Sequence, residues 1–336
     1  MRKHTFAKVT SAAIAAAATI VYEGSADAIT AIASCGTLDT FAASYVVTGD
    51  LTSCGPCLVV GNDRISIDLG KHTISGECEF GAGIGDGGET RQGTTIRNGT
   101  ITGFPFGIDM GSSIRTEIRD IESSGNSAQG MRLGPRSLVK RCVVTDNVGR
   151  GIEIAEGGQV LECTVQGNGG VGIFAVKDPL NVEFPFGWLI TQNTVKGNAV
   201  GIIVGEFPPD PAHVEAASTV SFNTTSENQF FGIVAGRRVL VTGNTADAND
   251  LDGISFGAFS TVSFNSARGN GNNGIDAGFE GLFDGSHSLI TGNLTNDNGG
   301  AGVAAQCPSV VTNNRASGNA VQYSFDGQGC QETNNK

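Results

Sequence analysis

The chain has 336 residues, with 50 glycines, only 9 prolines and 39% hydrophobic residues. Because average proteins contain about 7% glycine, this content predicts frequent turns, while the few prolines exclude a collagen and the hydrophobic content excludes a disordered chain. The formal net charge is −12. An acidic chain repels nucleic acid and anionic membrane surfaces, so we expect no nucleic-acid partner. The composition favours one long repeat array over two average domains.

Residues 1–28 are predicted to be a signal peptide. Basic residues at positions 2, 3 and 8 precede an apolar run over 9–22, and residues 26–28 read Ala-Asp-Ala, as at a cleavage site. The run is too short to cross a bilayer as a stable helix. We therefore expect an exported protein, secreted or periplasmic, without a membrane span. The alternative of a lipoprotein anchored through Cys35 stays open.

A glycine followed by an aliphatic residue recurs along the chain at steps of 21 to 31 residues. These glycines are Gly83, Gly107, Gly130, Gly151, Gly172, Gly201, Gly232, Gly253, Gly274 and Gly302. An asparagine stands four residues before most of them, and a second asparagine register runs through Asn193, Asn223, Asn244, Asn265, Asn293 and Asn314. The pattern indicates a repeat of about 21 residues, interrupted by insertions.

Each repeat holds three short β-rich stretches separated by Asn- and Gly-rich turns, and no segment has a helical period of useful length. Strands of successive repeats can stack about 4.8 Å apart, and aligned inward asparagines can then bond along the stack. The sequence predicts an all-β, right-handed parallel β-helix of about eleven coils. We expect an N-terminal cap over 29–57, the β-helix over 58–327 and a C-terminal tail over 328–336.

Residues 67–76, with the sequence Ile-Asp-Leu-Gly-Lys-His-Thr-Ile-Ser-Gly, precede Thr-Ile-Arg-Asn-Gly-Thr-Ile at 95–101 and Gly-Ile at 107–108. This phrase resembles the opening coils of exported β-helix proteins in the pectate-lyase-like superfamily. The resemblance covers about residues 36–330 and implies a polysaccharide partner. It does not specify an activity, because the superfamily includes lyases, hydrolases, epimerases, esterases and non-enzymatic binders.

Eight cysteines in an exported chain predict disulfides. In a coil stack, positions one repeat apart lie within the Cα distance that a disulfide spans. The spacing of 21 residues therefore predicts a bond or a packed thiol pair between Cys142 and Cys163, and a bond between Cys57 and Cys78. The remaining cysteines pair as Cys35 with Cys54, and as Cys307 with Cys330 in a C-terminal staple.

Three charged residues, Asp109, Arg132 and Glu153, follow the Gly-aliphatic pairs of consecutive coils and are expected to stack on the outer surface. In pectate-lyase-like enzymes this sheet commonly lines the substrate groove. The resemblance implies that Asp109 and Glu153 bind calcium and that Arg132 removes the proton next to a uronate carboxylate. The alternative is a surface ladder of salt bridges with little energetic value.

A second set of arginines, Arg97, Arg119 and Arg141, precedes the inward turns of three coils. Guanidinium groups suit carboxylates and sulfates, so these residues are expected to grip an anionic glycan. The alternative is that acidic neighbours at positions 117, 122 and 162 neutralise them.

Two insertions, at 177–188 and 206–215, are expected to leave the stack as neighbouring loops. Trp188 and His213 are candidate substrate-binding residues, although such aromatic groups can also cover the core. Residues 210–215, Asp-Pro-Ala-His-Val-Glu, resemble the Asp-Pro-His-Glu motif of mannuronan epimerases with two residues inserted.

These patterns predict a monomeric β-helix that engages polysaccharide, with a calcium-assisted lyase or epimerase as its most concrete enzymatic form. The competing hypothesis is a non-catalytic protein of the envelope or extracellular space that binds glycan or protein. The Asp-Asp and Gly-His-Gly motifs of polygalacturonases and the Gln-Asp-Thr motif of pectin methylesterases are absent. Their absence disfavours enzymes of those families.

Overall fold

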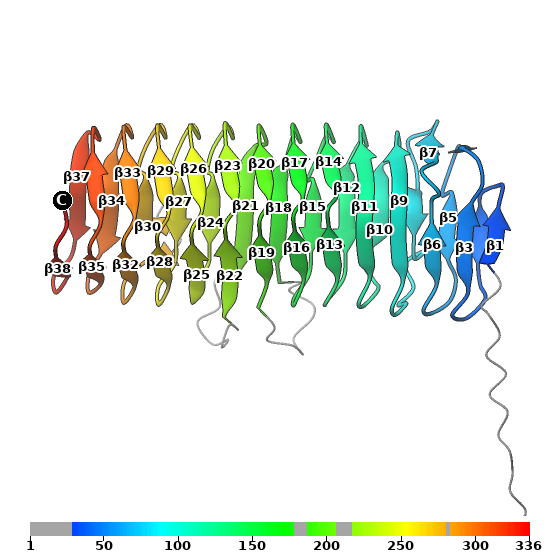
Figure 1. The fold of residues 1–336 in the computed structure, drawn as a ribbon, viewed down its shortest axis with the longest axis horizontal. Helices are drawn as coiled ribbons and strands as arrows, with labels where there is room; N and C mark the ends of the chain where they lie inside the picture. Colours follow the sequence, from blue (N-terminus) through cyan, green and yellow to red (C-terminus); the bar gives the residue numbers. More distant parts are fainter. Residues whose placement is uncertain (1–28, 178–186, 206–216, 280–282) are drawn as a thin grey trace, which may run out of the picture.

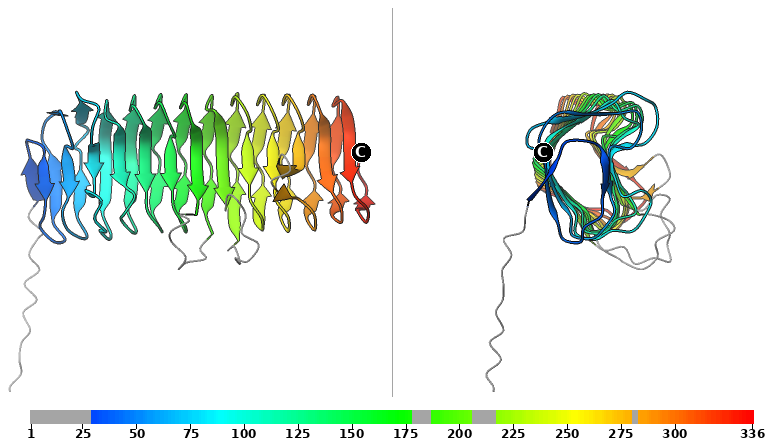
Figure 2. Two further views of the ribbon diagram at one scale, coloured as in Figure 1. Left: turned by 180° about the vertical axis from the view of Figure 1, so that it is seen from behind. Right: turned by 90° about the vertical axis from the view of Figure 1, so that its right-hand side faces the viewer.

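A computed structural model describes residues 29–177, 187–205, 217–279 and 283–336. Every regular element among them is a strand, and the strands stack into one elongated solenoid (Figure 1). Seen along its long axis, successive coils lie over one another (Figure 2). The predicted signal peptide lies outside the described residues. No helix in the described ranges is long and apolar enough to cross a membrane.

Most coils place one strand in one sheet and two strands in the other. We call the first the one-strand sheet. Its strands, in stacking order, are β2 (Gly36–Leu38), β5 (Leu58–Val60), β8 (Ala82–Gly85), β10 (Phe106–Met110), β12 (Gln129–Leu133), β15 (Ile152–Ile154), β18 (Val171–Val176), β21 (Val200–Gly205), β24 (Ile233–Ala235), β27 (Ile254–Phe256), β30 (Ile275–Phe279), β34 (Ala301–Gln306) and β37 (Val321–Asp326). They pair in parallel, and β31 (Phe283–Asp284) pairs antiparallel with β30.

The two-strand sheet contains two parallel rows of strands, and β9 and β11 run through both rows. The first row is β1 (Ile29–Ile32), β3 (Ser44–Val47), β6 (Ser66–Asp68), β9 (Thr95–Thr102), β11 (Glu117–Ser124), β13 (Leu138–Lys140), β16 (Gln159–Leu161), β19 (Leu189–Thr191), β22 (Ser218–Ser221), β25 (Val239–Thr242), β28 (Thr261–Ser263), β32 (Leu289–Thr291), β35 (Val310–Thr312) and β38 (Gln331–Thr333). The second row adds β4 (Leu51–Ser53), β7 (Thr73–Gly76), β14 (Val143–Thr145), β17 (Thr164–Gln166), β20 (Thr194–Lys196), β23 (Thr224–Ser226), β26 (Thr245–Asp247), β29 (Ser266–Arg268), β33 (Leu294–Asn296) and β36 (Arg315–Ser317).

Between the two rows, each regular coil turns through one residue with a left-handed backbone. Arg141, Phe222 and Phe264 occupy this position with φ of 52°, 54° and 55°. The next residue points inward and is usually an asparagine of the second predicted register. We call the left-handed position the corner position.

The asparagine registers form two buried ladders, as the spacing predicted. In the second ladder, Asn244 donates from its backbone N–H and its side chain to Asn265 Oδ1, at 2.9 and 3.0 Å. The Asn244 side chain also donates to the carbonyl of Val220 at 2.9 Å. Each amide therefore satisfies turn groups that would otherwise be buried without partners.

Aliphatic side chains fill the space between the sheets. Residues such as Ile118, Val139, Val160 and Ile190 are fully buried and follow one another in register along the stack. Alternation along each short strand sends one side chain into this core and its neighbours out. The core is therefore a continuous row along the axis, and the functional groups lie on the outer faces.

The stack extends beyond the predicted limits at both ends. Strands β1 to β4 lie within the predicted cap, and β38 lies within the predicted tail, where Asn314 donates to Asn335 Oδ1 at 3.2 Å. A terminal coil gains the same strand pairing as an internal one, which explains why residues 331–336 continue the repeat.

Three disulfides join adjacent coils. Cys307 is bonded to Cys330, which confirms the C-terminal staple. Cys142 and Cys163 are free and buried, in agreement with the packed thiol pair.

The predicted N-terminal pairing is wrong, because Cys35 bonds Cys57 and Cys54 bonds Cys78. The first coils are longer than 21 residues: Gly36 pairs with Leu58, 22 residues later. A spacing of 21 therefore does not align cysteines at this end. Disulfides of this kind are typical of exported proteins.

Candidate functional site

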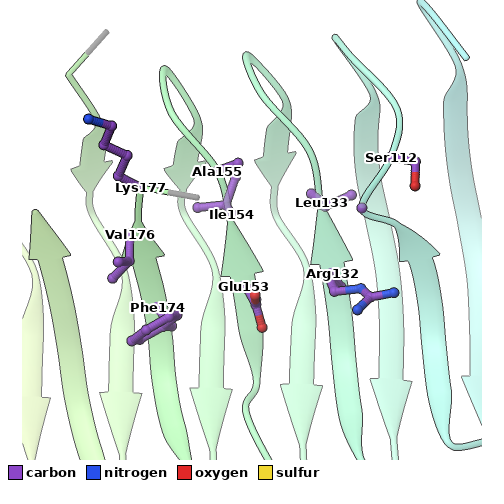
Figure 3. Close-up of a pocket in the computed structure, with 10 residues that line it drawn as sticks. Ser112, Arg132, Leu133, Glu153, Ile154, Ala155, Phe174, Val176 and Lys177 are labelled. Atoms are coloured by element: carbon purple, nitrogen blue, oxygen red, sulfur yellow. The ribbon is translucent and has the colours of Figure 1, made fainter. Parts of the chain in front are cut away.

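The one-strand sheet stacks charged and aromatic side chains on its outer face. Asp109, Arg132, Glu153 and Phe174 are paired in register on β10, β12, β15 and β18. This confirms that the three charged residues stack. Figure 3 shows Arg132, Glu153 and Phe174 side by side on successive strands.

Arg132 is held by a bidentate contact to Asp109. Its Nε and Nη2 atoms donate to Asp109 Oδ1 and Oδ2 at 2.8 and 2.7 Å. The guanidinium also lies over the ring of Phe106, with 5.0 Å from Cζ to the ring centroid. The hydrogen bond from Asp109 raises the pKa of Arg132 above its usual value. These contacts stabilise the charged form, so proton removal by Arg132 is less favourable than in a free arginine.

Glu153 is surrounded by donors. Its Oε2 atom accepts hydrogen bonds from Gln129 Nε2 at 2.8 Å and from Arg150 Nη1 at 2.6 Å. The Arg150 guanidinium lies 3.7 Å from the centroid of the Phe174 ring. Glu153, Arg150 and Phe174 thus form one cluster, in which a cation covers an aromatic face.

A pocket of about 480 Å³ opens along this row, at the ends of β10, β12, β15 and β18. Its lining residues are Gly111, Ser112, Arg132, Leu133, Glu153, Ile154, Ala155, Phe174, Val176 and Lys177. The sequence did not identify Ser112, Phe174 or Lys177 as site residues. Phe174 was detectable as the next member of the outward row, whereas Ser112 reaches the pocket only through the turn after β10.

The contacts of Asp109 and Glu153 do not fit a calcium site. Both Asp109 oxygens accept from the Arg132 guanidinium, and Glu153 accepts from the Arg150 guanidinium. A divalent cation prefers several free oxygens, and neighbouring guanidinium groups repel it. In the described part of the chain, no group of three or more His, Cys, Asp or Glu residues could hold a metal ion. Calcium binding stays a prediction, and no chemical step is assigned to it.

The second set of arginines lies on the two-strand sheet, away from Arg132. Arg97 pairs in register with Arg119, but Arg119 pairs with Lys140 and not with Arg141. Arg141 instead occupies the corner position. The predicted ladder therefore has only two arginine rungs, because consecutive arginines are 22 residues apart where the coil is 21 residues long.

Acidic partners hold all three of these arginines. Arg97 contacts Asp68 at 3.0 Å, Arg119 contacts Glu117, and Arg141 makes a bidentate contact with Asp120 at 2.8 Å. Lys140 contacts Glu162 at 2.9 Å. Neutralisation by acidic neighbours, the alternative interpretation, describes this surface better than a carboxylate grip.

Trp188 is a core residue and not an exposed platform for a sugar. Its side chain is 8% exposed, and its indole N–H donates to the carbonyl of Ala155 at 2.9 Å. The alternative that an aromatic residue of this insertion covers the core is thus confirmed for Trp188. His213 and the epimerase-like segment around it lie outside the described residues.

The comparisons with known proteins agree with this architecture. A sequence family described as the right-handed β-helix region matches residues 50–186. No curated protein matches the chain by sequence. Solved structures give the remaining similarities.

The A-module of mannuronan C-5 epimerase AlgE4 from Azotobacter vinelandii aligns with a TM-score of 0.62 at 15% identity, covering 88% of this chain and 90% of the module. The Dettilon tailspike protein aligns with a TM-score of 0.52 at 15% identity, covering 84% of this chain and 62% of the tailspike. A tailspike of Escherichia coli bacteriophage HK620, solved with a hexasaccharide, gives 0.50 at 14% identity, with 91% and 69% covered. At such identities the likeness establishes the fold and no activity.

Proposed function

We propose that this chain, a right-handed parallel β-helix of the pectate-lyase-like type, is an exported protein that binds an acidic polysaccharide in the pocket over β12, β15 and β18. The observation that carries the proposal is the row of Arg132, Glu153 and Phe174, with Arg150 against it. Guanidinium groups bind carboxylates, and an aromatic face suits the apolar face of a sugar. The titles of two structural neighbours name a mannuronan epimerase and a tailspike with a bound hexasaccharide.

Binding without turnover is the form of this function that the contacts favour. Arg132 is held as a cation, and Asp109 and Glu153 are occupied by guanidinium groups. A bound carboxylate can share the Arg132 guanidinium with Asp109 and needs no free base. The protein would act in the periplasm or outside the cell.

The first test is the affinity of the purified protein for alginate and pectate oligosaccharides, measured by titration calorimetry. We expect Arg132→Ala to weaken binding about tenfold or more, the usual loss for a hydrogen bond to a charged group. Higher salt should weaken the wild type as well.

Arg97→Ala is the matched control, because Arg97 is also paired with an aspartate and similarly exposed, at 51% against 43% for Arg132. It lies on the other sheet and should bind like the wild type. Equal loss in both variants, or no binding by the wild type, would contradict the proposal.

A calcium-assisted lyase or epimerase is the second candidate, favoured by the fold similarity to the AlgE4 A-module over 88% of this chain. Ultraviolet absorbance of unsaturated uronide products distinguishes a lyase from a binder. A signal abolished by a chelator and by Arg132→Ala would establish a lyase. A flat trace with retained affinity would support the binding protein, once product analysis by nuclear magnetic resonance shows no epimerised uronate.

A further inference from the structure

The two-strand sheet carries an uncharged outer face that the pocket does not use. It runs from β19 to β33, and we call it the neutral face. Four positions of each coil contribute to it. They are Leu189, Thr219, Leu240, Thr261 and Leu289; Thr191, Ser221, Thr242, Ser263 and Thr291; the corner residues Gln192, Phe222, Gly243, Phe264 and Gly292; and Thr194, Thr224, Thr245, Ser266 and Leu294.

None of these side chains is charged, although the whole chain has a net charge of −12. Charge returns at both ends of the neutral face, with Glu162 in the corner position of an earlier coil and Arg315 in the fourth position of a later one. The face is therefore a bounded region and not a general property of the surface. In Figure 1 its strands follow one another along the long axis, from β19 and β20 to β32 and β33.

Two phenylalanines dominate the neutral face. Phe222 and Phe264 are 65% and 71% exposed, the latter more than any other large hydrophobic side chain of the described residues. Leaving such rings in water is unfavourable, and exposed apolar groups gathered on one face often mark a binding surface.

The glycines between them let the rings lie against the surface. A Cβ atom on Gly243 would come within 2.7 Å of the Phe222 ring, and one on Gly292 within 2.7 Å of the Phe264 ring. Each ring thus covers the corner glycine of the following coil. The alternation Phe, Gly, Phe, Gly places one ring on every second coil, an interval of about 10 Å at the usual strand spacing.

Hydroxyl groups line both sides of the rings. On one side, Ser221 Oγ donates to Thr191 Oγ1 at 2.9 Å and Ser263 Oγ donates to Thr242 Oγ1 at 3.0 Å. On the other side stand Thr224 and Thr245, paired in register. The neutral face therefore offers ring faces and hydrogen-bonding hydroxyls in one periodic row.

We propose that the neutral face binds an extended, uncharged β-1,4-linked polysaccharide lying along the solenoid axis. Phe222 and Phe264 stack against every second sugar, because the two-sugar repeat of such a chain is close to the interval between the rings. The hydroxyl rows bond the sugar edges. This site is separate from the pocket and does not depend on the function proposed for it.

The chemistry of the neutral face favours a neutral glycan over a protein partner. Protein interfaces are enriched in Tyr, Trp, Met and Arg and depleted of Ser, whereas this face combines Phe with Ser and Thr. A glycan with carboxylates or sulfates would find no cation along these coils. An uncharged sugar presents the apolar faces and hydroxyl edges that fit both components.

The test is retention of the purified protein on microcrystalline cellulose and on chitin, measured as a binding isotherm at low and high salt. We expect the wild type to bind at least one of them with little effect of salt, since no ion pair is involved. The double variant Phe222→Ala, Phe264→Ala should bind about tenfold more weakly, from the loss of two aromatic stacking contacts.

Phe230→Ala is the matched control, because Phe230 is 48% exposed but lies outside the neutral face. It should bind like the wild type, as should Arg132→Ala, while the double variant keeps its affinity for acidic oligosaccharides. Lack of wild-type retention on both solids, or equal retention by the double variant, overturns the inference. Sedimentation velocity completes the test: a wild-type dimer that the double variant dissociates would make the face a self-association surface and would also overturn it.

Discussion

Asp276 shows how one side chain on the one-strand sheet differs from its neighbours. It is paired in register with Ser255 and Ala304, in the same outward row as Glu153. Burial, together with repulsion from Asp252, raises the pKa of Asp276 from 3.8 to about 7. Asp252 is itself buried and accepts hydrogen bonds from Asn272 and Asn273, at 2.7 and 2.8 Å. The row is therefore not uniformly solvated, as the sequence suggested.

Asp276 should make the protein less stable as pH rises. Between pH 3.8 and about 7 the folded state keeps a proton that the unfolded state has released, so the stability falls across this range. The pKa difference corresponds to at most about 4 kcal/mol. We expect Asp276→Asn to raise the urea midpoint at pH 8 and to change it little at pH 4.

The control for this prediction is Asp250→Asn, since Asp250 is exposed. Its urea midpoints should follow those of the wild type at both values of pH. Parallel pH dependence of the wild type and Asp276→Asn would show that this carboxyl does not control the effect.

At the scale of the element, the corner and its inward neighbour determine how one coil joins the next. Two cysteines take the first positions of the second ladder: Cys142 N–H donates to Cys163 Sγ at 3.4 Å, and Cys163 N–H donates to Asn193 Oδ1 at 2.9 Å. Asparagine then continues the ladder. A thiol accepts the turn N–H only weakly, whereas an amide accepts one and donates back to the previous coil.

Asn244→Ala tests the ladder. The substitution removes three donated bonds and leaves the backbone and side-chain N–H groups of Asn223 without their acceptor, Asn244 Oδ1, at 3.0 Å each. Because these groups are buried, we expect a loss of about 3 kcal/mol in the free energy of unfolding. Urea denaturation followed by circular dichroism provides the measurement.

Asn313→Ala changes the same residue type at an exposed corner position. Its loss should stay within about 0.5 kcal/mol, the usual range for surface substitutions. Similar losses in the two variants would mean that burial in the ladder is not the source of the stability.

At the scale of the whole molecule, the disulfides lie at the two ends of the stack. Cys35–Cys57 and Cys54–Cys78 join the first coils, and Cys307–Cys330 joins the last. An end coil has a neighbour on one side only and would otherwise fray. The covalent links therefore act where the stacking interactions are fewest.

Removing the C-terminal disulfide should loosen only that end. In the double variant Cys307→Ser, Cys330→Ser we expect β37 and β38 to lose hydrogen-exchange protection, by up to about 3 kcal/mol for a loop of this length. Central strands such as β15 and β18 are the internal control and should keep their protection, because coils contact only their neighbours. Loss of protection along the whole solenoid would contradict this view.

The sequence by itself determined the coil stack, the inward asparagines and the row of Asp109, Arg132 and Glu153, because a constant spacing of about 21 residues returns each position to the same place on the next coil. That reasoning holds only where the coil length is constant. It failed for the N-terminal disulfides and for Arg141, because a difference of one or two residues in coil length moves a side chain to another position.

The tertiary structure alone decided which groups meet. The guanidinium of Arg132 closes on Asp109, and the indole of Trp188 turns into the core, because neighbouring coils offer a carboxylate and a carbonyl at hydrogen-bonding distance. The exposed rings of Phe222 and Phe264 lie flat because the next corner is a glycine in each case. A repeat length places residues along the axis, but side-chain contacts depend on the coils on either side.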